Sequence, residues 1–241
     1  MKKINNAKCV HAFILGTFDP IHNGHCDLAW QASYCLRQIY TDRNIKLVIH
    51  IIPTLQNPNK EEPLFTFKER LNMINKAFKR FSLNGDCNMI FGDEIEETVK
   101  PKYTIELLRW LWENYNTDNC RLLLQRDDVE PNGLHWVLTK ETYNEIVDGK
   151  WYKSDEILRD MDTFNPLIVD IEKPCETNRG GLEYGKNISV DDNGKVIYTP
   201  IHSSDIRAAL EEGDFETIKK MVPEAIWDDL KQKCYGKKNN Y

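Results

Sequence analysis

Two histidines, His22 and His25, are the residues whose spacing points most directly to chemistry. They end the segment GTFDPIHNGH, residues 16–25, which follows an apolar run and precedes a helix-like stretch. Imidazoles three positions apart at a helix start share one face, beside backbone N–H groups that have no partner inside the helix. We therefore predict a strand, a tight turn and a helix that together hold an anion such as a nucleotide triphosphate.

The make-up of the turn separates it from an ordinary loop. A lone histidine is more often structural than functional, and Gly, Asp, Pro and Asn are common in any turn. Here Gly16 stands where backbone must approach a ligand, Pro20 stiffens the turn, and Gly24 precedes His25. The combination favours a binding site.

A second candidate is the segment IHSSDIR, residues 201–207. A helix that opens with Ser203 and Ser204 offers a capping hydroxyl and free N–H groups, and Arg207 lies one turn further on. Its fixed positive charge would suit the same anion pocket. Taken alone, the segment is equally typical of a well-capped helix with an exposed arginine.

The pattern of the chain predicts an α/β fold with a doubly wound parallel sheet, because short apolar runs alternate with helical patterns. The expected strands are residues 9–15, 46–52, 88–91, 121–124 and 167–171, and the expected helices include residues 24–40, 66–81 and one capped by Thr104. Ligands bind such sheets beyond the carboxyl ends of the strands. The segments 16–25 and 53–60 should therefore open onto one edge.

The rest of the chain departs from this alternation. Residues 125–150 read as an insertion, and Asn193-Gly194 between two apolar triplets indicates a hairpin turn. Three short helices are expected at the end, over residues 203–211, 214–221 and 223–233. We expect a main domain of residues 1–201 and a helical subdomain of residues 202–236.

Composition limits the classes of function. The 241 residues are 41% hydrophobic and 29% charged, as in an ordinary globular protein, and the net charge of −6 argues against a broad nucleic-acid-binding surface. Seven cysteines without a C-x-x-C pair favour reduced thiols over disulfides or a zinc site. No stretch approaches the roughly 18 apolar residues of a membrane span. We expect a cytoplasmic protein without a membrane partner.

The segment 16–25 resembles the (T/S)-x-x-H-x-G-H signature of the nucleotidylyltransferase superfamily, and its full form is similar to nicotinate- and nicotinamide-mononucleotide adenylyltransferases. The resemblance extends over residues 9–125 and 150–210. It implies a Rossmann-like nucleotidylyltransferase domain and a small C-terminal helical subdomain that completes the ATP site.

Further segments extend the resemblance. Residues 201–207 resemble I-S-S-T-x-I-R, which implies that Ser204 and Arg207 bind phosphate with Ser203 close by. Residues 53–60 resemble P-x-x-x-P-x-H-K, whose lysine, here Lys60, contacts ATP phosphates; Asn59 stands where histidine is usual. Residues 67–73 resemble F-x-x-R-x-x-M, a pattern more typical of a core helix than of a site.

The resemblance also implies a site for the pyridine mononucleotide. Tyr103 and Thr104 begin a stretch similar to Y-T-I-D-T-L, which binds the pyridine ring, and Trp151 begins one similar to W-x-x-x-x-x-I-L. A stacked tryptophan suits such a ring. Asp127 can take the part of the acid in the family's G-x-D triplet, whereas Gln125 stands where the glycine is usual.

The implied reaction is adenylyl transfer from ATP, with Mg²⁺ bound mainly by the triphosphate itself. The mononucleotide phosphate attacks the α-phosphorus in line and pyrophosphate leaves, which requires orientation and charge neutralisation rather than a protein nucleophile. The expected catalytic residues are His22, His25, Lys60 and Arg207. The residues Gly16, Thr17, Phe18, His22, His25, Asp127, Ser203, Ser204 and Arg207 are expected to bind ATP, and Lys60, Tyr103, Thr104 and Trp151 the mononucleotide.

Two other functions stay open. One is transfer to a different phosphorylated acceptor, such as phosphopantetheine or glycerol phosphate. The other is a nucleotide sensor that kept the ATP pocket and lost turnover, for which Asn59 and Gln125 are the best arguments. The choice between nicotinate and nicotinamide mononucleotide is also open, as is the oligomeric state.

Overall fold

A sheet of five parallel strands organises the chain, in the order β3-β2-β1-β4-β5. The computed structural model describes residues 9–42, 44–55, 61–79, 88–115, 120–125, 153, 156, 167–169, 188–190, 196–198 and 201–238. The strands are β1 (Cys9–Gly16), β2 (Lys46–Pro53), β3 (Asn88–Gly92), β4 (Cys120–Gln125) and β5 (Leu167–Val169). All neighbouring pairs are parallel, which confirms the predicted doubly wound sheet.

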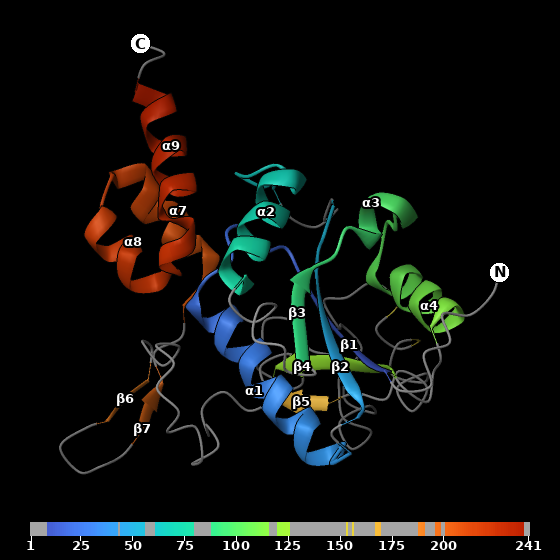
Figure 1. Cartoon of the computed structure of the whole chain (residues 1–241). Helices are drawn as coiled ribbons and strands as arrows, with labels where there is room; N and C mark the ends of the chain where they lie inside the picture. Colours follow the sequence, from blue (N-terminus) through green and yellow to red (C-terminus); the bar gives the residue numbers. More distant parts are fainter. Residues whose placement is uncertain are drawn as a thin grey trace.

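Helices lie on both sides of this sheet (Figure 1). They are α1 (Asn23–Ile39), α2 (Phe67–Phe78), α3 (Ile95–Val99) and α4 (Thr104–Asn114). Side chains of α1 and α2 share one hydrophobic core with alternate residues of β1, such as Ala12 and Ile14. Phe13, on the opposite face of the same strand, packs in a second core with α4. Burial of both faces explains why the strand sequences are nearly continuous apolar runs.

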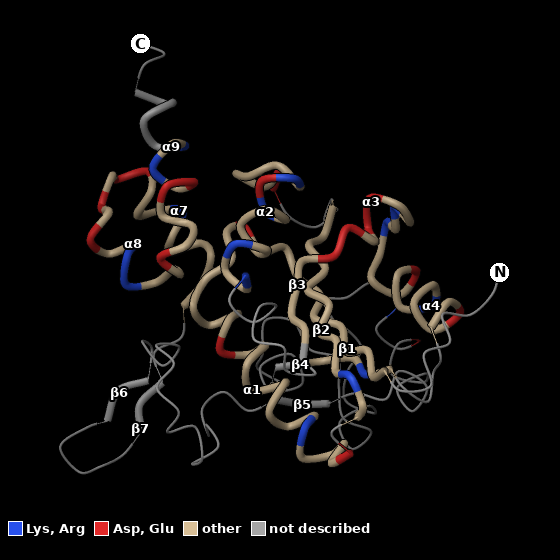
Figure 2. The backbone as a smooth tube through the Cα atoms, viewed as in Figure 1, with Lys and Arg blue, Asp and Glu red and all other residues tan. Residues whose placement is uncertain are grey.

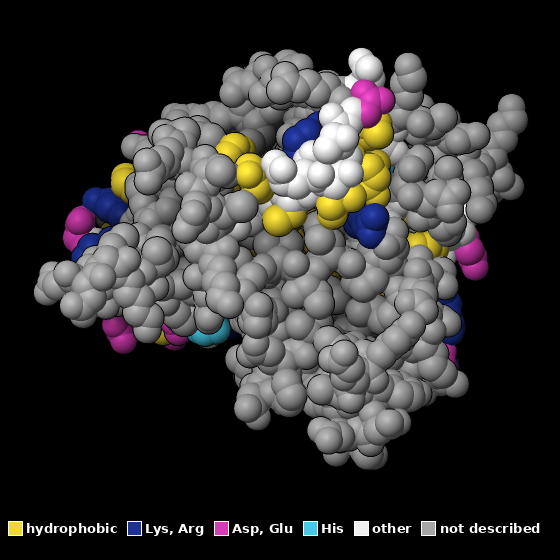
Figure 3. Space-filling model, turned by 90° about the horizontal axis from the view of Figure 1, so that it is seen from below, with side chains coloured by type: hydrophobic (Ala, Val, Ile, Leu, Met, Phe, Trp, Pro, Cys, Tyr) yellow, Lys and Arg dark blue, Asp and Glu magenta, His cyan; other side chains and the backbone are white. Residues whose placement is uncertain are grey.

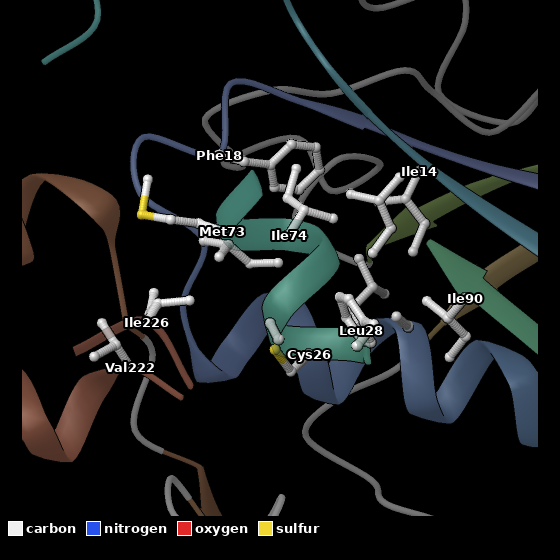
Figure 4. Close-up of a cluster of buried hydrophobic side chains, with 14 of the residues drawn as sticks. Ile14, Phe18, Cys26, Leu28, Met73, Ile74, Ile90, Val222 and Ile226 are labelled. Atoms are coloured by element: carbon white, nitrogen blue, oxygen red, sulfur yellow. The ribbon is translucent and has the colours of Figure 1, made fainter. Parts of the chain in front are cut away.

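The C-terminal helices are packed onto the first core. They are α7 (Ser203–Glu212), α8 (Phe215–Met221), the 3₁₀ turn η5 (Glu224–Ile226) and α9 (Trp227–Lys238). Figure 4 shows Val222 and Ile226 from this part beside Met73 of α2 and Cys26 of α1. An ion pair of 2.7 Å between Lys76 and Asp229 adds a tie from α2 to α9. The predicted helical C-terminal part is thus confirmed.

Several local predictions need correction. The helix α3 was not expected, and the predicted helix 223–233 is divided into η5 and α9. Thr104 is the first residue of α4 rather than its N-cap, which is Tyr103. Ser203 is likewise the first residue of α7, and the N-cap is His202. In both helices the N-cap, which is the last residue with extended backbone, lies one residue before the Thr or Ser whose hydroxyl was expected to cap the helix.

The hairpin signal is confirmed by β6 (Ile188–Val190) and β7 (Val196–Tyr198), which pair antiparallel. Residues 126–150 of the expected insertion and the Asn193-Gly194 turn lie outside the described residues.

A chain of partly buried polar groups lies on the α4 side of the sheet. Nδ1 of His11 and Nε2 of His50 are 2.9 Å apart, and Nδ1 of His50 is 2.6 Å from the Asp93 carboxylate. Asp93 also accepts the N–H of Ile95 at the start of α3. Burial and the nearby His50 lower the pKa of His11 to about 4, so this imidazole is neutral at pH 7.

Charge is spread over the described surface. In Figure 2 the acidic and the basic residues are scattered over the described helices, and the basic ones do not gather on one face. On the face seen in Figure 3, lysine and arginine side chains lie beside a group of hydrophobic ones. None of the described helices combines the length and the apolar character needed to cross a bilayer. Among the described residues, Cys9, Cys26, Cys35 and Cys120 form no disulfide bond.

Asp27, within α1, is a buried carboxyl group whose Oδ2 atom has no hydrogen-bond partner in the structure. Burial raises its pKa from the usual 3.8 to about 7. Between these values the folded state holds a proton that the unfolded state has lost. This group therefore lowers stability progressively as pH rises from about 4 to 7, and the loss is complete above 7.

We predict that Asp27→Asn stabilises the fold by roughly 2–4 kcal/mol at pH 8 and by less at pH 5, because the amide never ionises. Urea unfolding at both pH values measures the difference. Asp228→Asn, at a carboxyl group that is 92% exposed, is the control and should change stability little. An equal effect of Asp27→Asn at the two pH values would contradict the assignment.

Candidate active site

The turn between β1 and α1 stacks the two histidines face to face. Their ring centroids are 3.6 Å apart and the ring planes are inclined by 22°. His22 is the N-cap of α1, and its Nδ1 accepts the N–H of His25 at 3.4 Å. Nδ1 of His25 accepts the N–H of His22 in return, at 3.3 Å. This reciprocal capping box confirms the predicted helix start and fixes both rings.

The capping bonds determine where the protons lie. Because each Nδ1 accepts a backbone N–H, a neutral ring carries its proton on Nε2. His22 is buried, and burial lowers its pKa well below 6.5, with further lowering by the neighbouring charges of His25 and His202. His22 is therefore a neutral N–H donor at pH 7 rather than a cation. The predicted place of His22 beside a phosphate stays a prediction, and a neutral ring would fill it as a hydrogen-bond donor.

Gly16 makes room for an aromatic ring. A Cβ atom at Gly16 would lie 3.1 Å from the ring of Phe18, which itself has a left-handed φ of 51°. The Phe18 ring contacts His25 edge to face, with centroids 4.8 Å apart. The glycine thus serves the packing of the turn, and its close approach to a ligand stays a prediction.

Helix α7 is attached directly to this turn. The hydroxyl of Ser203 donates to the carbonyl of Pro20 at 3.0 Å, and Nη1 of Arg207 donates to the carbonyl of Asp19 at 2.8 Å. The same Nη1 lies 3.6 Å from the Asp19 carboxylate. The structure therefore brings Ser203 and Arg207 together with the histidine turn, although they are more than 180 residues away in sequence.

Two further contacts complete the junction. Nδ2 of Asn23, inside the H-x-G-H motif, donates to the carbonyl of Lys220 at the end of α8, at 3.1 Å. Ser204 and His202 are exposed on the first turn of α7. The N–H of His202 donates to the Asp205 carboxylate at 3.3 Å, so this helix start is also capped.

Buried charged side chains join the turn after β1 to the neighbouring loop. The Asp19 carboxylate accepts the N–H groups of Leu64 and Phe65, each at 2.9 Å. Arg70, which is 1% exposed, donates from Nε to the Phe65 carbonyl at 3.1 Å and from Nη1 to the Thr17 carbonyl at 2.5 Å. The turn after β1 is thereby joined to the segment that leads into α2.

Glu96 extends the network to the loop after β2. Its carboxylate accepts the N–H of Leu55, and burial raises its pKa to about 7, while that N–H and the Arg70 charge act in the opposite direction. Burial also lowers the pKa of Arg70, and the charges of Asp19 and Glu96 oppose this effect. The three charged groups thus compensate one another's desolvation.

The remaining predicted residues are divided between two places. Tyr103 and Thr104 lie at the start of α4, on the opposite side of the sheet from α1. Lys60, Asp127 and Trp151 lie outside the described residues. Of the four expected catalytic residues, His22 and His25 lie on the turn after β1, and Arg207 is hydrogen-bonded to that turn.

Sequence reasoning missed the supporting residues Asp19, Asn23 and Glu96, and treated Arg70 as part of a core helix. Arg70 is indeed buried in α2, as predicted, but its guanidinium group bonds loop carbonyls rather than filling space. A charged residue at a buried position of an otherwise apolar stripe was the available signal, because such a residue needs partners.

The arrangement is suited to an oxyanion-rich ligand. It combines the Nε2–H groups of the two histidines, a fixed guanidinium and the N-terminal ends of α1 and α7 within one junction. Helix α1 has no acidic residue in its first turn to oppose an anion. Among the described residues, no group of His, Cys, Asp or Glu is arranged to hold a metal ion.

The comparisons with known proteins agree with this geometry. Residues 13–209 match the cytidylyltransferase-like family. A Dictyoglomus thermophilum protein called a probable nicotinate-nucleotide adenylyltransferase is 27% identical over 88% of this chain and 92% of its own. Its namesake in Pelodictyon phaeoclathratiforme is 31% identical over 85% of this chain and 91% of its own.

Among the solved structures that are similar is a bifunctional NMN adenylyltransferase/ADP ribose pyrophosphatase from Francisella tularensis. It aligns with 85% of this chain and 42% of its own length, with 15% identity and a TM-score of 0.40. That score is too low to bear on function. The family match and the coverage of the curated relatives decide the assignment: this chain belongs to the cytidylyltransferase-like family and, within it, to the nicotinate-nucleotide adenylyltransferases.

Proposed function

We propose that the protein transfers AMP from ATP to nicotinate or nicotinamide mononucleotide, forming a dinucleotide of the NAD type and releasing pyrophosphate. The observation that carries the proposal is the junction of the histidine turn with α7, where Ser203 and Arg207 contact the carbonyls of Pro20 and Asp19. The names of the curated relatives support the same reaction.

The reaction needs charge stabilisation more than acid–base chemistry. As the mononucleotide phosphate attacks the α-phosphorus, negative charge develops on the α-phosphate and on the leaving pyrophosphate. Nε2–H groups of His22 and His25 would donate to these oxygens, and Arg207 would face the β and γ phosphates. Loss of one donor in a comparable site costs about 3–4 kcal/mol of transition-state stabilisation.

Capping prepares the two imidazoles for this role. Stacked at 3.6 Å and bonded through Nδ1, the rings do not need to reorient when the ligand arrives. A neutral His22 donates a hydrogen bond from Nε2–H without placing a positive charge beside the His25 ring. Stabilisation of developing charge by preorganised donors is usually the largest single contribution to enzymatic rate enhancement.

Magnesium enters the proposal with the substrate. The triphosphate of ATP provides the oxygens that Mg²⁺ prefers, and we propose that the metal is bound mainly by those oxygens. Lys60, Asp127, Tyr103, Thr104 and Trp151 keep their proposed roles toward ATP and the mononucleotide. The residues 202–236 are proposed as the subdomain that completes the ATP site.

The reaction is tested by incubating purified protein with Mg-ATP and each mononucleotide separately. We expect pyrophosphate and dinucleotide in equal amounts, and a loss of kcat/KM of at least about 100-fold in His25→Ala, because one phosphate donor is removed. Glu211→Ala, at an exposed position near the end of α7, is the matched control and should retain activity. Bound ATP without pyrophosphate release with either acceptor would favour a sensor instead.

The protonation state of His22 is tested by NMR of the histidine side chains, with His22→Gln for assignment. Because burial lowers its pKa well below 6.5, His22 should keep the pattern of a neutral Nε2–H imidazole from pH 8 down to pH 6. Because the unfolded chain binds this proton with the ordinary pKa of 6.5, stability falls as the pH drops below about 6.5, and the loss is complete below the lowered folded-state pKa. Titration of His22 with a midpoint near 6.5 would refute this assignment.

A further inference from the structure

The buried guanidinium of Arg70 has no role in the transfer reaction proposed above, yet it is one of the largest fully buried side chains described. A buried charge is costly unless it is paired and hydrogen-bonded, and well-packed apolar replacements of such groups are often as stable. Core packing alone therefore does not account for an arginine at this position of α2. Its contacts indicate what it does.

The two donors of Arg70 reach two different loops. Nη1 donates to the carbonyl of Thr17, five residues before His22, and Nε donates to the carbonyl of Phe65, which follows the 56–60 segment containing Lys60. Neither carbonyl belongs to α2, so the guanidinium bridges two loops across the carboxyl edge of the sheet.

Asp19 makes the complementary half of this bridge. It belongs to the histidine turn and accepts the N–H groups of Leu64 and Phe65. The same two loops are therefore joined twice, once through donors of Arg70 and once through acceptors of Asp19. Because Arg207 bonds the Asp19 carbonyl, the position of α7 depends on the same junction.

We propose that Arg70 is a positioning residue for the nucleotide site: by bridging the carbonyls of Thr17 and Phe65, it fixes the turn that carries His22 and His25 against the segment that follows Lys60. This rests on the proposed adenylyl transfer. The planar fork of arginine is essential to the role, because a lysine ammonium keeps the charge but does not span the two carbonyls with one rigid group.

The position of the histidine turn should affect kcat more than stability. Misplacement of reacting groups by about 1 Å can lower an enzyme's rate about 100-fold without removing a contact to substrate. A positioning role thus predicts a large loss of kcat at modest cost in stability. A role in core packing predicts the opposite, a loss of stability with little change of kcat in the folded fraction.

The experiment compares Arg70→Lys and Arg70→Met with Met73→Ala in the full chain. Met73 is fully buried in the same helix and makes none of the loop hydrogen bonds, so Met73→Ala is a matched perturbation of the core. We expect kcat to fall about 100-fold in both Arg70 variants and less than threefold in Met73→Ala, measured below the unfolding transition of each.

Amide hydrogen exchange gives a second readout that does not need activity. Peptides covering residues 16–25 and 61–66 should exchange at least about tenfold faster in Arg70→Lys than in Met73→Ala. Asp19→Asn should raise exchange in the same peptides, because it weakens the complementary bonds. If Arg70→Met does not fold, Arg70→Lys and Asp19→Asn carry the comparison.

Wild-type kcat in Arg70→Lys, or unchanged exchange in both peptides, overturns the proposal. Failure of the wild-type protein to transfer AMP to either mononucleotide counts against the proposed function instead. The exchange result still decides whether Arg70 fixes the two loops, so the two failures are distinguishable.

Discussion

The parallel pairing of the strands is the constraint on which the rest of the structure depends. Parallel neighbours require a crossover between each pair, and all carboxyl ends then lie at one edge of the sheet. Gly16, Pro53 and Gly92 end three adjacent strands in this way. The loops that follow them are held together by Asp19, Arg70 and Glu96, so the edge becomes a defined surface rather than a set of separate turns.

Elements with a strong and continuous pattern could be predicted from the sequence. The strands were predicted because both faces are buried, which gives short apolar runs bounded by polar residues. The start of α1 followed from the histidine motif, and the starts of α7 and α8 from their polar first turns, to within a residue. The five-residue α3 has no room for a helical period and gave no such signal.

The support of the site was harder to predict because it depends on distances between elements. Arg70 was assigned correctly to the buried side of α2, but the pattern does not say which carbonyls its guanidinium reaches. The sequence did not show that Gly16 also makes room for the Phe18 ring, because that contact depends on the left-handed backbone of Phe18. His50 likewise lies in an apolar strand, and only the fold places it between His11 and Asp93.

The ties between the histidine turn and the C-terminal helices also bear on how the polypeptide matures. Asn23 bonds Lys220 across 197 positions, and Ser203 and Arg207 meet the turn across 183 and 188 positions. Such distant contacts slow folding, because a long loop must close before they form. During synthesis on the ribosome, β1 and α1 emerge long before α7 and α8, so the nascent chain cannot complete the junction with the histidine turn until these helices leave the exit tunnel.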